Sequence, residues 1–411
     1  MAGPLRGIRV VDISQILAGP YCSQVLGDLG AEIIWIEQPV FGGGHRAIPG
    51  EPVNVPNYKG QPYIFTAFRR NKKSVVLDLK TSSGKQAVYD LIKVSDVVLD
   101  NYRPGVLERL GFDYETIKKV NPKIVSCSIT GWGASGPYAH RPALDVVMQG
   151  YAGFLSITGE PNGPPIKPGD GGGDCWTGLF AAAGVLSALY KRGVTGEGSR
   201  VEVSLLASIM AMMNYNFQWF FLSGENPTPM GTQHIGGVPY GAYKTRDGYI
   251  VITGGWPKLA RLINKPWMAD DPRFKTGAAR HDHRQEFVKE LEEALSHKDT
   301  DEWLKMFYAE DLIVGPVNKI SQVVEDPQVK HEKIIIDVES PLGGKMKMVG
   351  CPIKAEDISP HDYLAPPILG QHTDEVLTNI LHYSPEQINK IKEEIEANTA
   401  VREERRTRST R

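Results

Sequence analysis

Residues 9–37, RVVDISQILAGPYCSQVLGDLGAEIIWIE, predict a strand, a helix and a second strand in that order. The runs Arg9-Val-Val-Asp-Ile13 and Glu32-Ile-Ile-Trp-Ile36 are rich in β-branched residues, which favour strands. Between them, Gly19-Pro20 opens a helical pattern that ends near Gly30. This alternation is typical of a parallel sheet flanked by helices, so the sequence predicts an α/β fold.

The same alternation continues through the first half of the chain. Further strands are predicted at residues 74–79, 96–99, 124–129 and 200–204, and helices near residues 82–94, 104–119, 174–191 and 205–222. The last helix is long and apolar, but Asn214, Asn216 and Gln218 interrupt it. We therefore interpret it as a buried helix rather than a membrane span.

The second half predicts a smaller and more polar module. Residues 223–240 contain glycine and proline, which indicates a linker and a domain boundary near residue 225. Residues 241–252 predict a hairpin that turns at Asp247-Gly248, and polar helices follow between residues 284 and 309. A second linker at residues 357–370 precedes a closing helix at residues 384–398.

Length and charge limit the classes of function. With 411 residues the chain exceeds the roughly 250–300 residues at which one core stops growing, so we expect two domains. The net charge of −2 provides no global basic field, so neither nucleic acid nor a membrane surface is an expected partner. Four scattered cysteines favour a reducing compartment, and the N-terminus lacks the apolar stretch of an export signal, so we expect a cytoplasmic protein.

Several cofactor motifs are missing from the sequence. The turn after the first predicted strand contains Ala18-Gly19-Pro20 instead of GxGxxG, and no Walker sequence occurs, so neither NAD nor nucleotide hydrolysis is predicted. His281-Asp282-His283 has a spacing that does not place both imidazoles on one helix face. We therefore expect no metal site and no tightly bound cofactor.

Asp174 is a candidate nucleophile. The glycine-dense loop 168–174, which also contains Asp170, leads directly into a predicted helix. A helix dipole favours an ionised carboxylate at this position, and an ionised aspartate is a competent nucleophile. The alternative is a structural N-cap, which is a common role for aspartate at a helix start.

Cationic and donor residues form a second candidate set at the ends of predicted strands. The set comprises the run Arg69-Arg-Asn-Lys-Lys73 together with Lys80, Asn101, Tyr102, Arg103 and Arg109. In an α/β sheet the ligand crevice lies beyond the carboxyl ends of the strands, where Lys80, Asn101, Arg103 and Arg109 could converge on phosphates. The alternative is a group of solvated loop charges.

Several blocks of this sequence, in order, resemble the family III CoA-transferases. The matching blocks are Pro4-Leu-Arg-Gly-Ile-Arg-Val-Val-Asp12, Ala18-Gly-Pro20, Leu29-Gly-Ala-Glu-Ile-Ile-Trp-Ile-Glu37, Asn71-Lys-Lys-Ser-Val-Val-Leu-Asp-Leu-Lys80, Asn101-Tyr-Arg-Pro-Gly105, Arg109-Leu-Gly111, Gly131-Trp-Gly-Ala-Ser-Gly-Pro137, Asp174-Cys-Trp-Thr-Gly178, Gly315-Pro-Val-Asn318 and Leu369-Gly-Gln-His-Thr-Asp-Glu-Val-Leu377. The resemblance spans nearly the whole chain, and it specifies the family more strongly than the substrate.

The resemblance implies a function and a set of site residues. It implies a transferase that moves CoA from an acyl-CoA donor to a carboxylic acid acceptor through an aspartyl-CoA thioester, with Asp174 as nucleophile and Asp145 as a second acidic residue or an N-cap. Gly236-Gly237 resembles a flexible glycine loop that covers the reacting carboxylate and excludes water. The residues implied to line the CoA site are Ile16, Leu17, Ala18, Leu77, Lys80, Asn101, Tyr102, Arg103 and Arg109. Gln38 stands where a family member can carry arginine.

The resemblance also implies an architecture. We expect a large doubly wound, Rossmann-like domain made from residues 1–224 and 331–411, with a smaller α+β domain at residues 225–330 between them. We further expect two subunits threaded through each other as an interlocked homodimer, in which the apolar helix at residues 205–222 lies at a buried interface.

Two other functions are compatible with the same architecture. An α-methylacyl-CoA racemase would carry Gly-His-Asp where this chain has Ala143-Leu144-Asp145, so its histidine base is replaced by leucine. His140 is a nearby substitute that is offset by four residues. A non-catalytic acyl-CoA binding protein is the second alternative, against which Asp174 and the glycine loop argue.

Overall fold

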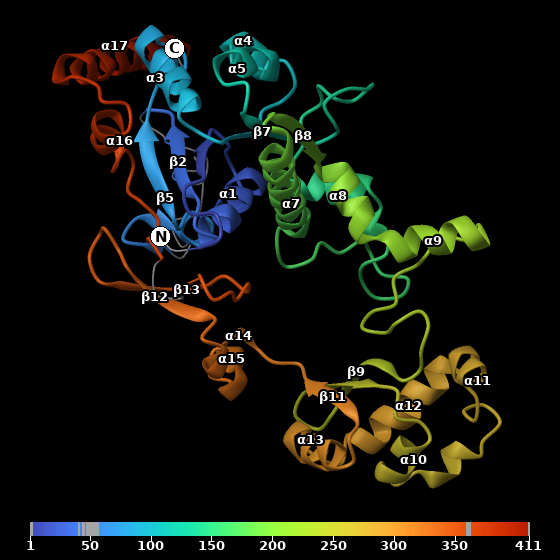
Figure 1. Cartoon of the computed structure of the whole chain (residues 1–411). Coiled ribbons are helices and arrows are strands. Elements are labelled where there is room, and N and C mark those ends of the chain that lie inside the picture. The colour runs from blue at the N-terminus through green and yellow to red at the C-terminus, as the bar shows by residue number, and fades with distance from the viewer. Residues whose placement is uncertain (1–2, 40–41, 43–45, 47–56, 359–362, 410–411) are drawn as a thin grey trace. The chain divides into compact units, whose positions relative to one another are not determined.

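The computed structural model describes residues 3–39, 42, 46, 57–358 and 363–409. Contacts divide the chain into two compact units, which we describe separately (Figure 1). The large unit comprises Met1–Phe154, Pro168–Phe221 and Glu332–Arg411, and the small unit comprises Leu155–Lys167 and Leu222–His331. The small unit thus includes a segment, residues 155–167, that the division expected from the sequence leaves in the large domain.

A parallel sheet forms the centre of the large unit, as the sequence predicted. Its strands are β1 (Arg9–Asp12), β2 (Glu32–Glu37), β5 (Lys72–Val76), β6 (Val97–Asp100), β7 (Val125–Thr130) and β8 (Ser199–Ser204). They lie in the order β5-β2-β1-β6-β7-β8, and all neighbouring pairs are parallel. Numbered along the chain within this sheet, the order is that of the Rossmann fold, 3-2-1-4-5-6.

Helices cover both faces of this sheet (Figure 1). α1 (Ala18–Asp28) and α7 (Gly172–Thr195) pack against each other, and α7 also contacts β7 and β8. On the other face of the sheet, one hydrophobic core includes Val11, Ile34 and Val98 of the strands. The helices that contribute to it are α3 (Ser82–Lys93), α5 (Tyr114–Val120), α16 (Thr373–Asn379) and α17 (Pro385–Ser409). Residues that alternate along each strand therefore supply two hydrophobic layers, because successive side chains point to opposite faces.

The remaining elements of the large unit are short. They are β3 (Asn57–Tyr58), β4 (Gln61–Pro62), α2 (Tyr63–Ala67), α4 (Val106–Leu110), α6 (Asp145–Tyr151), η1 (Phe154–Ser156), α8 (Leu205–Met212), α9 (Asn214–Ser223), β12 (Ile335–Glu339) and β13 (Lys345–Val349), with η1 and α9 reaching across the unit boundary.

Two helices expected from the sequence are each divided. The segment expected at residues 104–119 forms α4 and α5, because Gly111 ends α4 in the left-handed conformation with φ 84°. The apolar segment expected at residues 205–222 forms α8 and α9, which are separated at Met213. Among the described helices, none combines the length and the hydropathy that crossing a bilayer requires.

The small unit contains an antiparallel sheet with helices packed on it. Its strands β9 (Tyr240–Lys244), β10 (Tyr249–Thr253) and β11 (Ile313–Pro316) lie in the order β11-β10-β9, and β9 and β10 form the predicted hairpin. Its helical segments are α10 (Lys258–Leu262), η2 (Pro266–Ala269), α11 (Gly277–Asp282), α12 (Arg284–Leu295), α13 (Thr300–Ala309), α14 (Ile320–Val323) and α15 (Pro327–Glu332, whose last residue belongs to the large unit). Tyr243, Ile250, Phe287 and Phe307 are fully buried in its core.

Candidate active site

The centre of the parallel sheet creates a natural binding position. β1 and β6 are neighbours, and from them the strand order continues in opposite directions along the chain. Loops that leave the carboxyl ends of such strands separate and leave a crevice, which is where ligands bind in open α/β sheets. The loop after β1 begins at Ile13, and the loop after β6 begins at Asn101.

Asn101 joins these two loops. Its Oδ1 accepts a hydrogen bond from the backbone N–H of Gln15 at 2.8 Å, and its Nδ2 donates to the Gln15 carbonyl at 2.6 Å. The Gln15 side chain donates from Nε2 to the Tyr102 hydroxyl at 3.1 Å. The two loops are therefore held together before any ligand arrives.

A cavity of about 610 Å³ opens at this crevice. It is lined by Gln15, Ile16, Asn101, Tyr102, Arg103, Pro104, Val106, Arg109 and His140. Two guanidinium groups in an open cavity can bind phosphate oxygens, because arginine presents a fork of donors that matches them. Arg103, Arg109, Asn101, Tyr102 and Ile16 are thus brought together, as the expected CoA site requires.

Other residues expected at the CoA site lie elsewhere. Leu77 is in the hydrophobic core with 1% exposure, and Lys80 is exposed after β5 and does not line the cavity. Leu17 and Ala18 are buried at the start of α1 rather than on the cavity wall. Their assignment as direct CoA contacts stays a prediction.

The cationic run at residues 69–73 is mostly interior, which contradicts its interpretation as solvated loop charge. Arg69 and Lys72 are fully buried, and Arg70 is 5% exposed. Arg70 forms a bidentate ion pair with Asp28, and Lys72 Nζ lies 3.0 Å from Asp12 Oδ2. Burial of these cations is possible because each has an anionic or carbonyl partner.

Asp174 lies in the first turn of α7, where the sequence places the candidate nucleophile. Its backbone N–H donates to Asp145 Oδ1 at 3.0 Å, so Asp145 caps α7 from the first turn of α6. The other oxygen of Asp145 accepts a hydrogen bond from Gln149 Nε2 at 2.5 Å. Neither residue is the N-cap of its own helix, because those positions are Leu144 in α6 and Gly171 in α7. Asp145 instead supplies an acceptor to the first turn of α7 from another helix.

The electrostatic setting of Asp174 differs from the expectation of a helix dipole that favours the ionised form. Burial, followed by the nearby charge of Asp145, raises the pKa of Asp174 to about 7. At neutral pH, a carboxyl group with this pKa is protonated in part of the molecules and ionised in the rest. Strongly perturbed pKa values of this kind are enriched at catalytic sites.

Glycines let the surrounding backbone approach closely. A Cβ at Gly173 would lie 2.4 Å from Asp145 Oδ1, and a Cβ at Gly178 would lie 2.7 Å from the Ala18 carbonyl oxygen. These distances explain why glycine occupies both positions around Asp174. A Cβ at Gly171 would lie 3.5 Å from Leu17 Cδ1, so the loop after β1 reaches the segment that leads to Asp174.

The glycine pair Gly236-Gly237 lies in the small unit. The Gly236 N–H donates to His234 Nδ1 at 3.0 Å, and the His234 ring stacks on Tyr240. Arg284 Nη1 donates to the His234 carbonyl at 2.8 Å, which anchors the start of the loop. The role of this loop over Asp174 stays a prediction.

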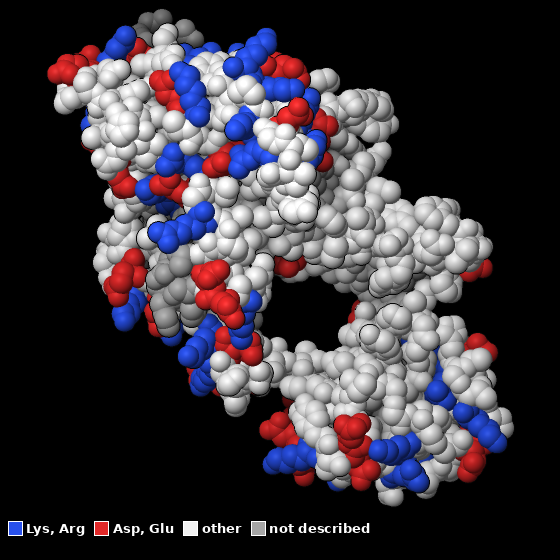
Figure 2. Space-filling view, viewed as in Figure 1, with Lys and Arg blue, Asp and Glu red and all other residues white. Residues whose placement is uncertain are grey.

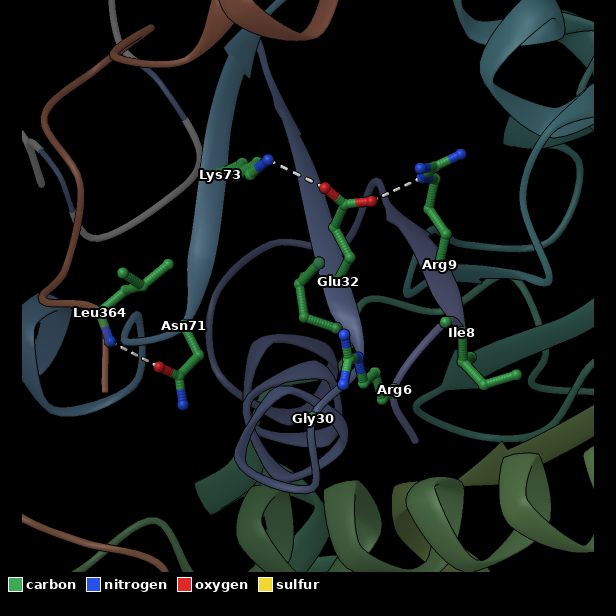
Figure 3. A pocket seen from close by; sticks show the side chains of 10 residues that line it. Arg6, Ile8, Arg9, Gly30, Glu32, Asn71, Lys73 and Leu364 are labelled. Atoms are coloured by element: carbon green, nitrogen blue, oxygen red, sulfur yellow. Dashed lines mark hydrogen bonds and ion pairs between the residues drawn. The ribbon is translucent and has the colours of Figure 1, made fainter. Parts of the chain in front are cut away.

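A second cavity, of about 360 Å³, lies at the amino ends of the strands, and Figure 3 shows the residues that line it. There Glu32 accepts a hydrogen bond from Arg9 Nε at 2.7 Å and another from Lys73 Nζ at 2.9 Å. These residues stand at the amino ends of β1, β2 and β5. Because Arg9 and Lys73 both pair with Glu32, and because this is the end of the strands opposite the crevice, we do not assign the active site here.

Two polar residues that line the crevice, Gln15 and His140, were not among the site residues predicted from the sequence. Gln15 is in the short loop between β1 and α1, and the rule that ligands bind beyond the carboxyl ends of strands could have included it. His140 was considered only as a substitute base, whereas it lines the same cavity as Arg103 and Arg109. Leu144, at the position of the racemase histidine, is 61% exposed.

Comparison with known families and proteins gives one consistent result. The model of CoA-transferase family III matches residues 5–373. Succinyl-CoA:glutarate CoA-transferase of Mus musculus is 34% identical over 392 residues, which cover 94% of this chain and 89% of that protein. Formyl-CoA:oxalate CoA-transferase of Rhodopseudomonas palustris is 32% identical, with 95% of this chain and 96% of that protein covered.

A solved structure has the same fold. The crystal structure of a CAIB/BAIF family protein from Brucella suis aligns with a TM-score of 0.83 and 32% sequence identity. The alignment covers 92% of this chain and 100% of that chain. The similarity therefore extends over both units and is not confined to the parallel sheet.

Proposed function

Because the chain belongs to CoA-transferase family III, as its sequence blocks predicted, we propose that Asp174 carries CoA as a covalent thioester during transfer. The observation that carries this proposal is the position of Asp174 in the first turn of α7, capped by Asp145 and with a pKa raised to about 7. A partly buried carboxyl group that is partly ionised at neutral pH can act as a nucleophile and can also serve as a leaving group.

We propose that the crevice between the loops after β1 and β6 binds the nucleotide part of CoA. Arg103 and Arg109 would bind its phosphates, and Asn101 would keep the two loops together. The cavity of about 610 Å³ has the size of a ligand site, and its guanidinium groups suit an anionic ligand.

The proposed reaction balances without an additional reagent. A carboxylate oxygen of Asp174 attacks the donor thioester carbon, the carbon–sulfur bond breaks, and CoA leaves as a thiolate to give a mixed anhydride. The thiolate then attacks the aspartyl carbon of the anhydride, and the donor acid leaves as a carboxylate. The acceptor carboxylate attacks the aspartyl-CoA thioester carbon, the carbon–sulfur bond breaks, and CoA leaves as a thiolate to give a second mixed anhydride. The thiolate then attacks the acceptor carbon of this anhydride, which forms the acceptor CoA ester and releases the Asp174 carboxylate.

We propose small dicarboxylic acids as the substrates. Relatives at 34% identity over most of the chain are named for succinyl-CoA and glutarate, and a relative at 32% is named for oxalate. An acid that retains a second carboxylate needs a cationic partner in the site, because an isolated buried charge is costly.

We also propose a homodimer whose subunits interlock through the apolar segment of α8 and α9. Neither helix contains a charged residue, and Figure 2 shows the surface over them without Lys, Arg, Asp or Glu. On α9 the exposed fractions of Phe221 and Leu222 are 70% and 79%. Exposed apolar patches of this kind mark interaction sites.

We propose the cytoplasm as the compartment, supported by the free state of all four cysteines. Two of them, Cys22 and Cys127, are buried in the large unit, and burial raises the pKa of both thiols. Such thiols are protected from oxidation and need no disulfide partner.

The test is intact-mass analysis of the protein after incubation with succinyl-CoA, combined with exchange of labelled succinate into the CoA ester. We expect a CoA adduct on the wild type, its loss in Asp174→Ala, and its retention in Asp170→Ala. Asp170 is the matched control because it is an exposed aspartate of the same loop. Transfer that survives in Asp174→Ala would overturn the covalent assignment, and α-proton exchange without transfer would favour a racemase.

A further inference from the structure

We propose that Arg69 is a positioning residue that holds the loop after β1 in a strained conformation, and that this conformation sets the geometry of the acyl-CoA site. The inference rests on the proposed function, since the loop matters because it lines the crevice and touches the segment before Asp174. Arg69 itself does not line the cavity and is not a catalytic residue.

The strained residue is Ile16. Its φ of 63° lies in the left-handed region, which a β-branched side chain rarely adopts because its Cβ substituents clash with the backbone. Its side chain is 37% exposed on the cavity wall, so burial in the core does not compensate for this conformation. Such outliers persist only where surrounding interactions determine them, and they cluster at ligand sites.

Hydrogen bonds hold the chain on both sides of Ile16. Before it, the backbone N–H and carbonyl of Gln15 bond to the side chain of Asn101. After the Ile16 α-carbon, its own carbonyl accepts a hydrogen bond from Arg69 Nη2 at 2.6 Å. A short charge-assisted bond on that carbonyl fixes the plane of the Ile16–Leu17 peptide, which relaxation of Ile16 to negative φ would rotate.

The location of Arg69 explains how this bond is kept rigid. The guanidinium is fully buried, with its centre 5.0 Å from the Trp35 ring and 5.7 Å from the Phe65 ring. Trp35 Nε1 also donates to the Ser14 carbonyl at 3.1 Å, so the ring under Arg69 holds the same loop. An apolar side chain of similar volume would fill this space without the cost of desolvating a cation. The guanidinium donates from Nη1 to the Phe68 carbonyl at 3.1 Å and from Nη2 to the Ile16 carbonyl, and an apolar side chain could make neither bond.

The loop transmits this conformation to the nucleophile segment. Leu17 follows Ile16, and its Cδ1 lies 3.5 Å from the position of a Cβ on Gly171, three residues before Asp174 in the chain. The first turn of α1 begins at Ala18, and α7 packs closely on it at Gly178. If Ile16 relaxes, Leu17 and the start of α1 move relative to the first turn of α7.

The central experiment is a double-mutant cycle between Arg69→Gln and Ile16→Gly, with steady-state kinetics for succinyl-CoA. We expect Arg69→Gln to lower kcat/KM by about tenfold or more, mainly through a higher KM for the acyl-CoA, because the loop is no longer held for binding. Glycine adopts positive φ without strain, so adding Ile16→Gly should restore about threefold or more of the loss. Ile16→Ala removes the same side chain but keeps a Cβ, and it should restore less than Ile16→Gly.

Arg46→Gln is the matched control for loss of a buried cation. Arg46 lies over the same two rings, 5.5 Å from Trp35 and 4.3 Å from Phe65, but it pairs with Glu37 instead of the loop. We expect Arg46→Gln to lower the melting temperature while kcat/KM at a permissive temperature is unchanged. Equal losses of kcat/KM in Arg46→Gln and Arg69→Gln, or no better rescue by Ile16→Gly than by Ile16→Ala, would overturn the proposal.

Hydrogen exchange of the peptide that contains residues 13–19 separates this inference from the proposed function. Faster exchange in Arg69→Gln, with no change in Arg46→Gln, is expected whether or not the wild type forms a CoA adduct. A wild type without CoA transfer would refute the proposed function alone. Unchanged exchange in Arg69→Gln would refute the role of Arg69 alone.

Discussion

The backbone N–H of Asp174 donates a hydrogen bond to Asp145 Oδ1 across 3.0 Å, so one acidic residue caps the helix that carries the other. The cap holds the first turn of α7 in place, and its charge is one of the causes that raise the pKa of Asp174 to about 7, after burial. Asp145 therefore both orients the proposed nucleophile and increases its affinity for a proton.

The pH profile of transfer should report this pair. Asp174 must be ionised to attack, so we expect kcat/KM to fall as the pH drops below the pKa of Asp174, which is about 7. Asp145→Asn keeps an oxygen acceptor for the Asp174 N–H but removes the negative charge, which lowers the pKa of Asp174. The acid limb of the kcat/KM profile should move down by about one pH unit. An acid limb that does not move would show that the charge of Asp145 has no influence on the group that titrates.

The stability of the fold should also depend on the protonation of Asp174, but in the opposite direction to transfer, because the protonated form stabilises the fold. The pKa of Asp174 is raised from 3.8 to about 7 by folding, so its protonated form stabilises the fold at low pH, and this stabilisation is lost as the pH rises through about 7. Asp174→Asn imitates the protonated form. Its advantage in the free energy of unfolding over the wild type should therefore grow by roughly 2 kcal/mol between about pH 5 and about pH 8. Urea denaturation of both proteins at the two pH values measures this difference, and a constant difference would contradict the raised pKa.

Strands of the parallel sheet could be predicted from the sequence because burial on both faces requires continuous runs of apolar β-branched residues. β2 and β6 contain such runs, whereas β1 has only Val10 and Val11 between charged residues and β7 alternates apolar residues with serine. The structure places all four strands within two residues of the expected bounds. The break between α4 and α5 could not be predicted, because a glycine is tolerated inside a helix and only the structure shows the left-handed φ of Gly111.

The parts of the site that depend on contacts between residues far apart in the sequence could not be predicted either. Asp145 and Asp174 are 29 positions apart, and nothing in their spacing indicates that one caps the helix of the other. Arg69 belongs to a run of charges that the sequence left open as ligand-binding or solvated, yet it is buried against Trp35 and Ile16. Charged residues are usually exposed, and a sequence does not show the partners, distant along the chain, that allow a charged residue to be buried.

Close packing between α1 and α7 should be sensitive to one methyl group. A Cβ at Gly178 would lie 2.7 Å from the Ala18 carbonyl oxygen, which is backbone and cannot rotate away. We expect Gly178→Ala to lower the free energy of unfolding by about 1–3 kcal/mol. Gly193 is in the same helix, and a Cβ there would have nothing within 4 Å. Because alanine favours a helix more than glycine does, Gly193→Ala should raise the free energy of unfolding by about 0.5–1 kcal/mol. Urea denaturation of the two variants separates steric contact from helix propensity, and equal effects of the same sign would contradict the packing.

Arg109 and Lys80 offer a test of which cations bind CoA. Arg109 lines the crevice with Arg103, whereas Lys80 is exposed beyond β5 and does not line it. We expect Arg109→Ala to raise the KM for acyl-CoA by about tenfold with kcat nearly unchanged, because a phosphate contact contributes equally to substrate and transition state. Lys80→Ala should change the KM by less than about threefold. The same kinetics at increasing salt should raise the KM of the wild type more than that of Arg109→Ala, since exposed charge pairs are screened. If Lys80→Ala instead has the larger effect, the nucleotide of CoA extends past β5 and the crevice at β1 and β6 is not its main binding site.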